Sequence, residues 1–355
     1  MRKGTMRKRD YYNRKALFDT GADYLMVFGQ NCSGKSYQGK EECIERALKG
    51  ERFFFLRRWI PDLNQNIATS YFDDMPVSKY TKGEWDNIVA RAGCFYFQRM
   101  GEDGKPEKSE VIGYYGVLTE WQRYKSNVYL NCTFILFEEF ITDGVYLDNE
   151  PEKLQRICTT VFRSRKGQVM MIGNTISRIN PYFNEWTPNV PKQKQGTIEI
   201  YHMHDAVGEG VEITIACEYG GRIKGSGSMF FGETSKSIMA GEWSVVDQPK
   251  LPKELHLYEM VYELALEYQT FGFVLQLLVD PEEGSKILFV YPKTGQRKFD
   301  RVITDKFSTD IMTTRYFNDN RPESYMQECI AKQRVCYSDN LTATDFLTVI
   351  DQMKL

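Results

Sequence analysis

Short apolar runs, each stopped by glycine or by charged residues, recur through the first half of the chain. They occupy residues 23–29, 52–59, 132–141 and 168–175. Runs of this length that are apolar on both faces indicate buried strands. Residues 35–48 are predicted as a helix that ends before Gly50, and residues 150–165 as a second helix. Apolar strands that alternate with helices predict an α/β fold with a parallel sheet covered on both faces.

Two local patterns refine this prediction. The second helix has apolar residues at the helical spacing of three to four, namely Leu154, Ile157, Cys158, Val161 and Phe162. This spacing places them on one face, which we expect to be buried. The sequence GEDGK at residues 101–105 lies between two apolar runs and predicts a β-hairpin.

The pattern changes after residue 220. Residues 220–237 are rich in glycine and serine, which suits a flexible connection. Beyond it we predict a helix over 251–268, an antiparallel meander of strands over 271–280, 285–292 and 297–305, and helices from Arg321. The chain is therefore predicted to have three parts: an α/β domain over 1–220, a linker over 221–250 and an α+β domain over 251–355.

Charge and hydropathy narrow the class of protein. Of the 355 residues, 26% are charged and 42% hydrophobic, with a net charge of −2, which is typical of a soluble globular chain. No apolar run is long enough to cross a bilayer, so no membrane partner is expected. A protein that coats nucleic acid over its whole surface would be more basic. Lys or Arg fills seven of the first fifteen positions, which indicates either a solvated tail or a basic arm touching DNA or a neighbouring subunit.

The sequence GQNCSGKS matches the phosphate-loop pattern G-x-x-x-x-G-K-[ST]. It lies between a predicted strand and a predicted helix, which is the context that this motif requires. Lys35 is expected to reach the β- and γ-phosphates of ATP, and Ser36 to bind Mg²⁺. The predicted nucleotide-binding residues are Gly29, Gln30, Asn31, Cys32, Ser33, Gly34, Lys35 and Ser36.

Two adjacent carboxylates end the apolar sequence FILFEEF. Glu138 is predicted to lie in the magnesium shell and Glu139 to act as the catalytic base, because successive side chains of a strand alternate in direction. Glutamate is longer than the usual aspartate, so Glu138 is expected to hold Mg²⁺ through a water molecule. Small-molecule kinases usually lack the second acid, so the pair favours an ATPase. The alternative is a pair of surface acids at a strand end.

Several segments together resemble the DNA-packaging ATPases of small short-tailed bacteriophages of the Salasvirus type. They are YYN, GQNCSGKS, FLRRW, EWQRYKSN, FILFEEFI, VFRSR and IGNTISRINPYF, which follow one another over residues 11–187. The resemblance implies an additional-strand catalytic-glutamate (ASCE) P-loop ATPase domain, followed by an RNase H-like domain that is a vestigial nuclease. It also implies a ring, usually of five copies, in the host cytoplasm. That ring sits at the portal vertex of the capsid and drives double-stranded DNA inward through the portal.

The resemblance also implies roles for single residues. Glu138 takes the position of the magnesium aspartate, and Glu139 that of the catalytic glutamate. Arg163 matches an arginine finger that reaches the ATP of the neighbouring subunit, and Lys125 is a second candidate to act in trans. Asn174 takes the place of a polar sensor of the γ-phosphate. This sequence departs from the family pattern at two positions. Glu138 replaces the usual aspartate, and Asn31 stands where some relatives carry arginine.

Other functions stay open from the sequence. Asp280, Asp300 and Asp305 lie on or near predicted strands of the second domain, and their convergence would indicate a terminase-type motor with an active nuclease. A different P-loop DNA translocase, a small-molecule kinase and a ring protein without ATPase activity are further alternatives. Arg165 and Lys166 are candidates for DNA contact. In some relatives a scaffold RNA mediates docking, and the sequence leaves its use here open.

Overall fold

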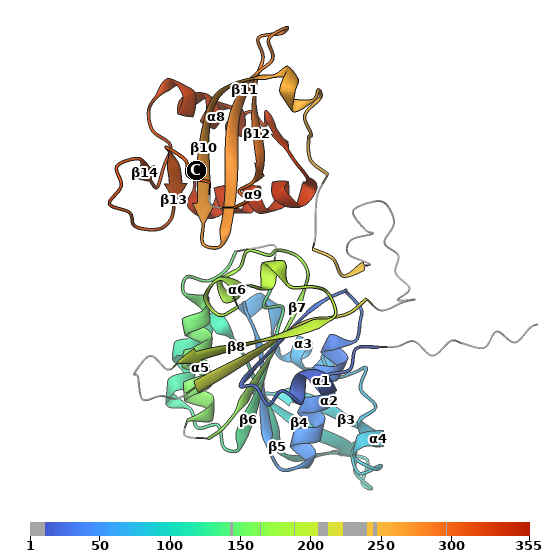
Figure 1. The fold of residues 1–355 in the computed structure, drawn as a ribbon. Coiled ribbons are helices and arrows are strands. Elements are labelled where there is room, and N and C mark those ends of the chain that lie inside the picture. The colour runs from blue at the N-terminus through green and yellow to red at the C-terminus, as the bar shows by residue number, and fades with distance from the viewer. Residues whose placement is uncertain are drawn as a thin grey trace, which may run out of the picture. The chain divides into compact units, whose positions relative to one another are not determined.

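The computed structural model describes residues 11–142, 145–163, 165–187, 189–204, 212–222, 240–243, 247–295 and 297–355. Most of the predicted basic arm and of the predicted linker lies outside the described residues. By its internal contacts the chain divides into two compact units, shown in Figure 1. The predicted boundaries of the three parts stay a prediction.

The first unit is built on one sheet. Its strands are β1 (Tyr24–Gly29), β2 (Arg52–Arg57), β3 (Asn87–Arg91), β4 (Cys94–Met100), β5 (Pro106–Val117), β6 (Cys132–Glu138), β7 (Gln168–Asn174), β8 (Thr197–His204) and β9 (Glu212–Tyr219). They are ordered β3-β4-β5-β2-β6-β7-β1-β9-β8. Six neighbouring strands run parallel, namely β5, β2, β6, β7, β1 and β9. At the edges β3, β4 and β8 pair antiparallel. The predicted parallel sheet and the β4–β5 hairpin are confirmed.

Helices cover both faces of this sheet (Figure 1). They are α1 (Lys15–Phe18), α2 (Lys35–Leu48), α3 (Gln65–Ser70), α4 (Val77–Tyr80), α5 (Glu150–Phe162) and α6 (Pro181–Glu185), with 3₁₀ turns η1 (Ile60–Asp62), η2 (Leu118–Ser126) and η3 (Val190–Lys192). Because side chains alternate along a strand, Leu25 of β1 packs in one buried cluster with Ile44 of α2. Phe28, on the opposite face of β1, contacts Phe183 of α6 at 5.2 Å between ring centroids.

Two predicted elements end earlier than expected. Helix α5 stops at Phe162, and its predicted continuation to Arg165 is wrong, because Arg163 has a φ of 53° and a ψ of −119° that no α-helix contains. The five predicted core residues of α5 are all buried. Strand β6 stops at Glu138 instead of Ile141, since Glu139 has a φ of 59°, outside the strand region.

The second unit holds a six-stranded sheet in the order β14-β13-β10-β11-β12-β15. Its elements are η4 (Leu255–Leu257), β10 (Glu259–Tyr268), β11 (Phe271–Val279), β12 (Lys286–Pro292), β13 (Val302–Thr304), β14 (Thr313–Thr314), α8 (Arg321–Ala331), β15 (Val335–Tyr337) and α9 (Asn340–Met353). Its core joins the inner sides of β10, β11 and β12 to α8 and α9. The antiparallel pairing of β11 with β12 and the C-terminal helices are confirmed.

Two predictions in this unit are wrong. Residues 251–268 were predicted as a helix, but residues 259–268 form β10. Glu259, Glu263 and Glu267 recur every four residues, and this even spacing fits one face of a strand as well as one face of a helix. Pairing with β11 on one side and β13 on the other decides for the strand. Strand β13 runs parallel to β10, so it does not continue an antiparallel meander.

Asp280, a candidate ligand for a nuclease metal, follows β11 and is nearly buried. Its carboxylate forms an ion pair of 2.9 Å with Lys253. Within the described ranges, no three His, Cys, Asp or Glu side chains gather in a way that could hold a metal ion. The RNase H-like character of this unit stays a prediction. Across the same described residues, no helix is both long and apolar enough to span a membrane.

Candidate nucleotide site

The phosphate loop connects β1 to α2, and its backbone takes positive φ values at two glycines. Gly29 has a φ of 147° and Gly34, the N-cap of α2, a φ of 98°. Both values favour glycine, because a Cβ atom strains the backbone there. A Cβ atom at Gly29 would also lie 3.3 Å from the backbone oxygen of Gly220. Residues 31–38, which include the first turn of α2, line a cavity, and the first N–H groups of a helix have no intrahelical partner and so can bind an anion.

Lys35 is buried, and its ammonium group bonds to oxygen atoms of the loop. Its Nζ atom donates to the carbonyl oxygens of Gln30 at 2.6 Å and Gly29 at 3.3 Å. It also donates to Ser33 Oγ at 3.2 Å and to Asn174 Oδ1 at 3.4 Å. Burial lowers the pKa of Lys35 to about 8, although the nearby Cys32 and Glu138 oppose this shift. An anionic phosphate in the cavity would raise this pKa and so favour the charged form.

This pKa predicts how nucleotide binding depends on pH. The charged ammonium binds phosphate, and its pKa of about 8 in the free protein must rise in the complex, so binding takes up a proton as the pH passes above 8. We expect the Kd for ATP to increase about tenfold between pH 7 and pH 9. Isothermal titration calorimetry at several pH values measures this change.

The matched control is Lys35→Arg, because a guanidinium stays charged over the whole range. Its Kd, whatever its absolute value, should depend only weakly on pH. A wild-type Kd that is constant from pH 7 to pH 9 would contradict the assignment of Lys35 as the group that binds phosphate.

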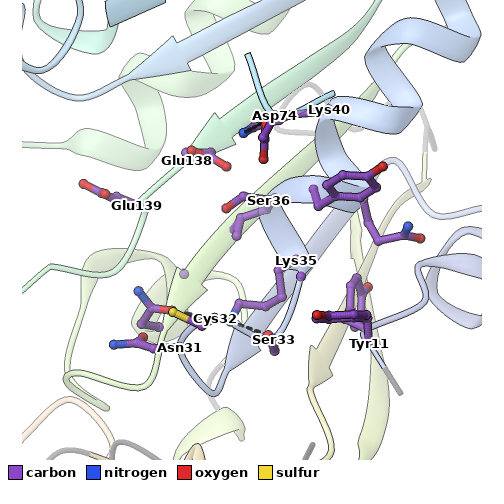
Figure 2. Close-up of a pocket in the computed structure, with 17 residues that line it drawn as sticks. Tyr11, Asn31, Cys32, Ser33, Lys35, Ser36, Lys40, Asp74, Glu138 and Glu139 are labelled. Carbon is purple, nitrogen blue, oxygen red and sulfur yellow. Dashed lines mark hydrogen bonds and ion pairs between the residues drawn. The ribbon is translucent and has the colours of Figure 1, made fainter. Parts of the chain in front are cut away.

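The sheet order brings the functional strand ends together. Gly29 of β1 pairs with Asn174 of β7, and Glu138 of β6 pairs with Ile172 of the same β7. Since carboxyl ends of parallel strands meet at one edge, Glu138, Ile172 and Asn174 line one cavity of about 920 Å³ with residues 31–36 of the phosphate loop. Gly29 and Gln30, which were also predicted to bind the nucleotide, do not line it. Figure 2 shows Lys35, Ser36 and Glu138 around this cavity. The distance between Lys35 and Asn174 places the predicted sensor next to the phosphate lysine.

The two carboxylates occupy different surroundings. Glu138 is buried and lines the cavity together with Ser36. Its carboxylate contacts the buried hydroxyl of Tyr71, and burial together with this carboxylate raises the pKa of Tyr71. A carboxylate and a hydroxyl that line one cavity fit a magnesium site, because Mg²⁺ prefers oxygen ligands. Glu139 is exposed on the turn after β6. The predicted alternation along one strand is therefore wrong, and a left-handed backbone separates the two side chains instead.

Arg57, at the end of β2, contacts both acids and was assigned no role from the sequence. Its Nη2 atom donates to Glu139 Oε2 at 2.7 Å, and its Nη1 atom lies 3.6 Å from Glu138 Oε2. The two arginines of FLRRW were visible in the sequence at the end of a predicted strand. The contact of Arg57 with the acids was not, because only the sheet order makes β2 and β6 neighbours. Asp74 was also missed; it lines the cavity and forms an ion pair of 2.8 Å with Lys40.

The segment before β1 forms another wall of the cavity. Tyr11 lines it beside Gly34 (Figure 2). The N–H group of Tyr12 donates to the carbonyl oxygen of Ser33 at 2.9 Å, and its hydroxyl donates to Glu218 Oε2 at 2.9 Å. The YYN sequence is thus attached directly to the phosphate loop.

The two residues predicted to act in trans lie together, in a different place. Arg163 and Lys125 line a second cavity of about 480 Å³ with Arg156, Thr159 and Thr160. None of these residues lines the nucleotide cavity. Arg163 donates to the carbonyl oxygen of Asn127 at 3.1 Å, and Lys125 Nζ lies 4.6 Å from the centroid of the Trp121 ring. Arg165, a candidate for DNA contact, instead donates to the carbonyl oxygens of Tyr129 and Val161.

Comparisons with known proteins agree with one another. A model of the family described as Podovirus DNA encapsidation protein (Gp16) matches residues 6–224, more than half of the chain. The chain is 27% identical over 327 residues to the DNA packaging protein of Bacillus phage phi29, and this matched region covers 89% of each chain. It is 35% identical over 162 residues to the DNA packaging protein of Bacillus phage B103, covering 44% of this chain and 46% of that protein.

A solved structure is similar over nearly the whole length. It belongs to the bacteriophage Phi-29 viral genome packaging motor assembly. It shares 22% sequence identity and a TM-score of 0.56, covering 97% of this chain and 99% of that chain. At this identity the likeness concerns the fold.

Proposed function

Because the chain belongs to the Podovirus DNA encapsidation protein (Gp16) family, we propose that it is an ATP-driven motor. This motor moves double-stranded viral DNA into a preformed capsid. One observation carries the ATPase part of this proposal: the phosphate loop, two carboxylates and a polar strand end line a single cavity. A loop that only bound phosphate would not need the second carboxylate. The relatives named as DNA packaging proteins support the DNA part.

The residues of the cavity divide the work of hydrolysis. Lys35 and the N–H groups of the loop bind the phosphates of ATP. Ser36 and Glu138 are the residues that would hold Mg²⁺, which supplies positive charge against the charge on the transferring phosphoryl group. Asn174 contacts Lys35 and is placed to respond to the γ-phosphate.

Glu139 orients and deprotonates the attacking water. In this conformation its carboxylate is paired with Arg57, so one of its oxygen atoms is occupied by the guanidinium and not by the attacking water. Catalysis therefore requires that Glu139 leave Arg57. We propose that this contact keeps turnover low until the site is assembled.

Arg163 and Lys125 complete the site of a neighbouring copy. Within one chain they line a cavity separate from the nucleotide cavity, so in a head-to-tail ring one copy can offer them to the next. A cation supplied in trans stabilises the transition-state charge and makes hydrolysis depend on assembly. We propose a ring, with five copies as the expected number, on the portal vertex in the host cytoplasm, where a scaffold RNA is an additional candidate partner.

The test of this function is ATP turnover with and without double-stranded DNA. We expect DNA to increase the turnover of the full chain, and DNA binding to weaken steeply with salt because phosphate contacts release counterions. Fluorescence anisotropy with a labelled duplex at several salt concentrations measures the second effect.

Lys35→Ala is the control for this measurement. It should abolish turnover while leaving the salt dependence of DNA binding in place. Turnover that ignores DNA, together with DNA binding that ignores salt, would overturn the motor and favour a small-molecule enzyme.

A further inference from the structure

Arg58 forms a buried ion pair that the mechanism above does not use. It follows β2 directly and is 3% exposed, while Glu150, the first residue of α5, is fully buried. Arg58 Nε lies 2.9 Å from Glu150 Oε2, and Arg58 Nη2 lies 2.9 Å from Oε1. This bidentate geometry is the strong form of an arginine–carboxylate contact.

The same guanidinium also binds the backbone next to the catalytic glutamate. Arg58 Nη1 donates to the carbonyl oxygen of Glu139 at 2.9 Å, and Nη2 donates to that of Phe140 at 2.8 Å. Glu139 has a φ of 59°, a backbone conformation that costs energy for a residue other than glycine and persists only when its surroundings hold it. Arg58 supplies that hold through two consecutive carbonyl groups.

The surroundings keep this pair charged and well bonded. Burial opposes the charge of Arg58, but the hydrogen bonds and charge of Glu150 raise the pKa of Arg58 overall. Glu150 also accepts a hydrogen bond from the Tyr182 hydroxyl at 2.9 Å and from the N–H group of Leu147 at 3.0 Å. The Tyr146 ring lies 4.9 Å from the guanidinium carbon.

Arg58 also connects to the elements that carry the cations proposed to act in trans. Through Glu150 it binds the N-terminus of α5, and Arg163 lies at the C-terminus of that helix. Through its own carbonyl oxygen it accepts a hydrogen bond of 3.2 Å from Thr119, which lies in η2 with Lys125. Helix α5 runs without interruption from Glu150 to Phe162, so Arg58 and Arg163 contact opposite ends of one helix.

On the basis of the proposed function, we infer that Arg58 is a positioning residue. It holds the backbone of Glu139 in the left-handed conformation and ties this turn to α5, so that the catalytic glutamate and the helix bearing Arg163 keep one relative placement. Buried ion pairs are otherwise weak contributors to stability, since apolar pairs of similar volume often replace them without loss. A pair kept only for stability would therefore be replaceable.

The key variant is Arg58→Lys, which keeps a positive charge beside Glu150. A lysine ammonium lacks the planar set of five donors, so it cannot bind the carboxylate and both carbonyl groups together. We expect kcat for ATP to fall about tenfold to a hundredfold, with the KM and the Kd for ATP unchanged. A second variant, Arg58→Met with Glu150→Met, should show the same loss of kcat at a thermal midpoint close to that of the wild type.

The second unit offers a matched control. Arg301 and Glu323 form an equally buried ion pair of 3.0 Å, and Arg301 likewise donates to backbone carbonyl groups, those of Met312 and Tyr316. Arg301→Lys, and Arg301→Met with Glu323→Met, should leave kcat without DNA unchanged. Thermal unfolding, steady-state turnover and binding of a fluorescent ATP analogue are measured for every variant.

The outcomes separate this inference from the proposed function. A wild-type chain without ATP turnover overturns both. If the wild type turns over ATP and Arg58→Lys retains its kcat, the inference alone is overturned, because charge at this position then suffices. An equal loss of kcat in the Arg301 variants also overturns it, since any buried pair would have the same effect.

Discussion

Replacing Glu139 with glutamine is expected to lower kcat for ATP hydrolysis by about 10²–10⁴-fold, the usual contribution of a positioned general base. Glutamine keeps the size of the side chain and its hydrogen bond to Arg57 but cannot accept the proton of water. The Kd for ATP should not change, because Glu139 is exposed on the turn beyond β6 and the phosphates bind at Lys35 and the loop. Single-turnover hydrolysis and nucleotide binding measure the two quantities separately.

Glu110→Gln is the control for this variant. Glu110 is an exposed glutamate on β5 that does not line the nucleotide cavity, so its substitution removes the same charge without touching the site. Full turnover by Glu139→Gln would refute the assignment of the catalytic base. Loss of ATP binding in this variant would instead point to a role for Glu139 in the phosphate or magnesium site.

Replacing Arg163 with alanine is expected to lower turnover by about 10³–10⁵-fold, the range for a finger supplied in trans. The Kd for ATP of a single chain should stay the same, since Arg163 lies outside the nucleotide cavity. When Arg163→Ala chains are mixed with wild-type chains, ATP turnover should fall by more than the decrease in the fraction of wild-type chains alone. The control is Arg123→Ala, because Arg123 is also an exposed arginine but lies in η2.

Mixing two inactive variants gives the sharpest version of this experiment. A ring that contains Glu139→Gln and Arg163→Ala chains includes sites with an intact Glu139 from one copy and an intact Arg163 from the next. We therefore expect the mixture to regain activity that neither variant has alone. No recovery in rings of mixed composition, established by native mass spectrometry, would show that Arg163 acts within its own chain or not at all.

The phosphate loop was readable from the sequence because its chemistry is local. Gly29, Gly34, Lys35 and Ser36 lie within eight consecutive residues, and the strand and helix around them follow from apolar patterning. Glu138 was readable because it ends a strongly apolar strand. The C-terminal strand β10 was not, because glutamates spaced by four satisfy both a helix and a strand, and only its neighbours β11 and β13 distinguish the two.

Local sequence thus predicted which residues would bind phosphate and six strands of the first sheet, β1, β2, β4, β5, β6 and β7, but not β3, β8 or β9. The tertiary structure alone decided how the acids are held. Arg57 and Arg58 are adjacent in the chain but point to different partners, one to the carboxylate of Glu139 and the other to its carbonyl group and to Glu150. These contacts join positions about 80–90 residues apart. The physical reason is that such contacts arise from the order of strands in a sheet, which no short stretch of sequence contains.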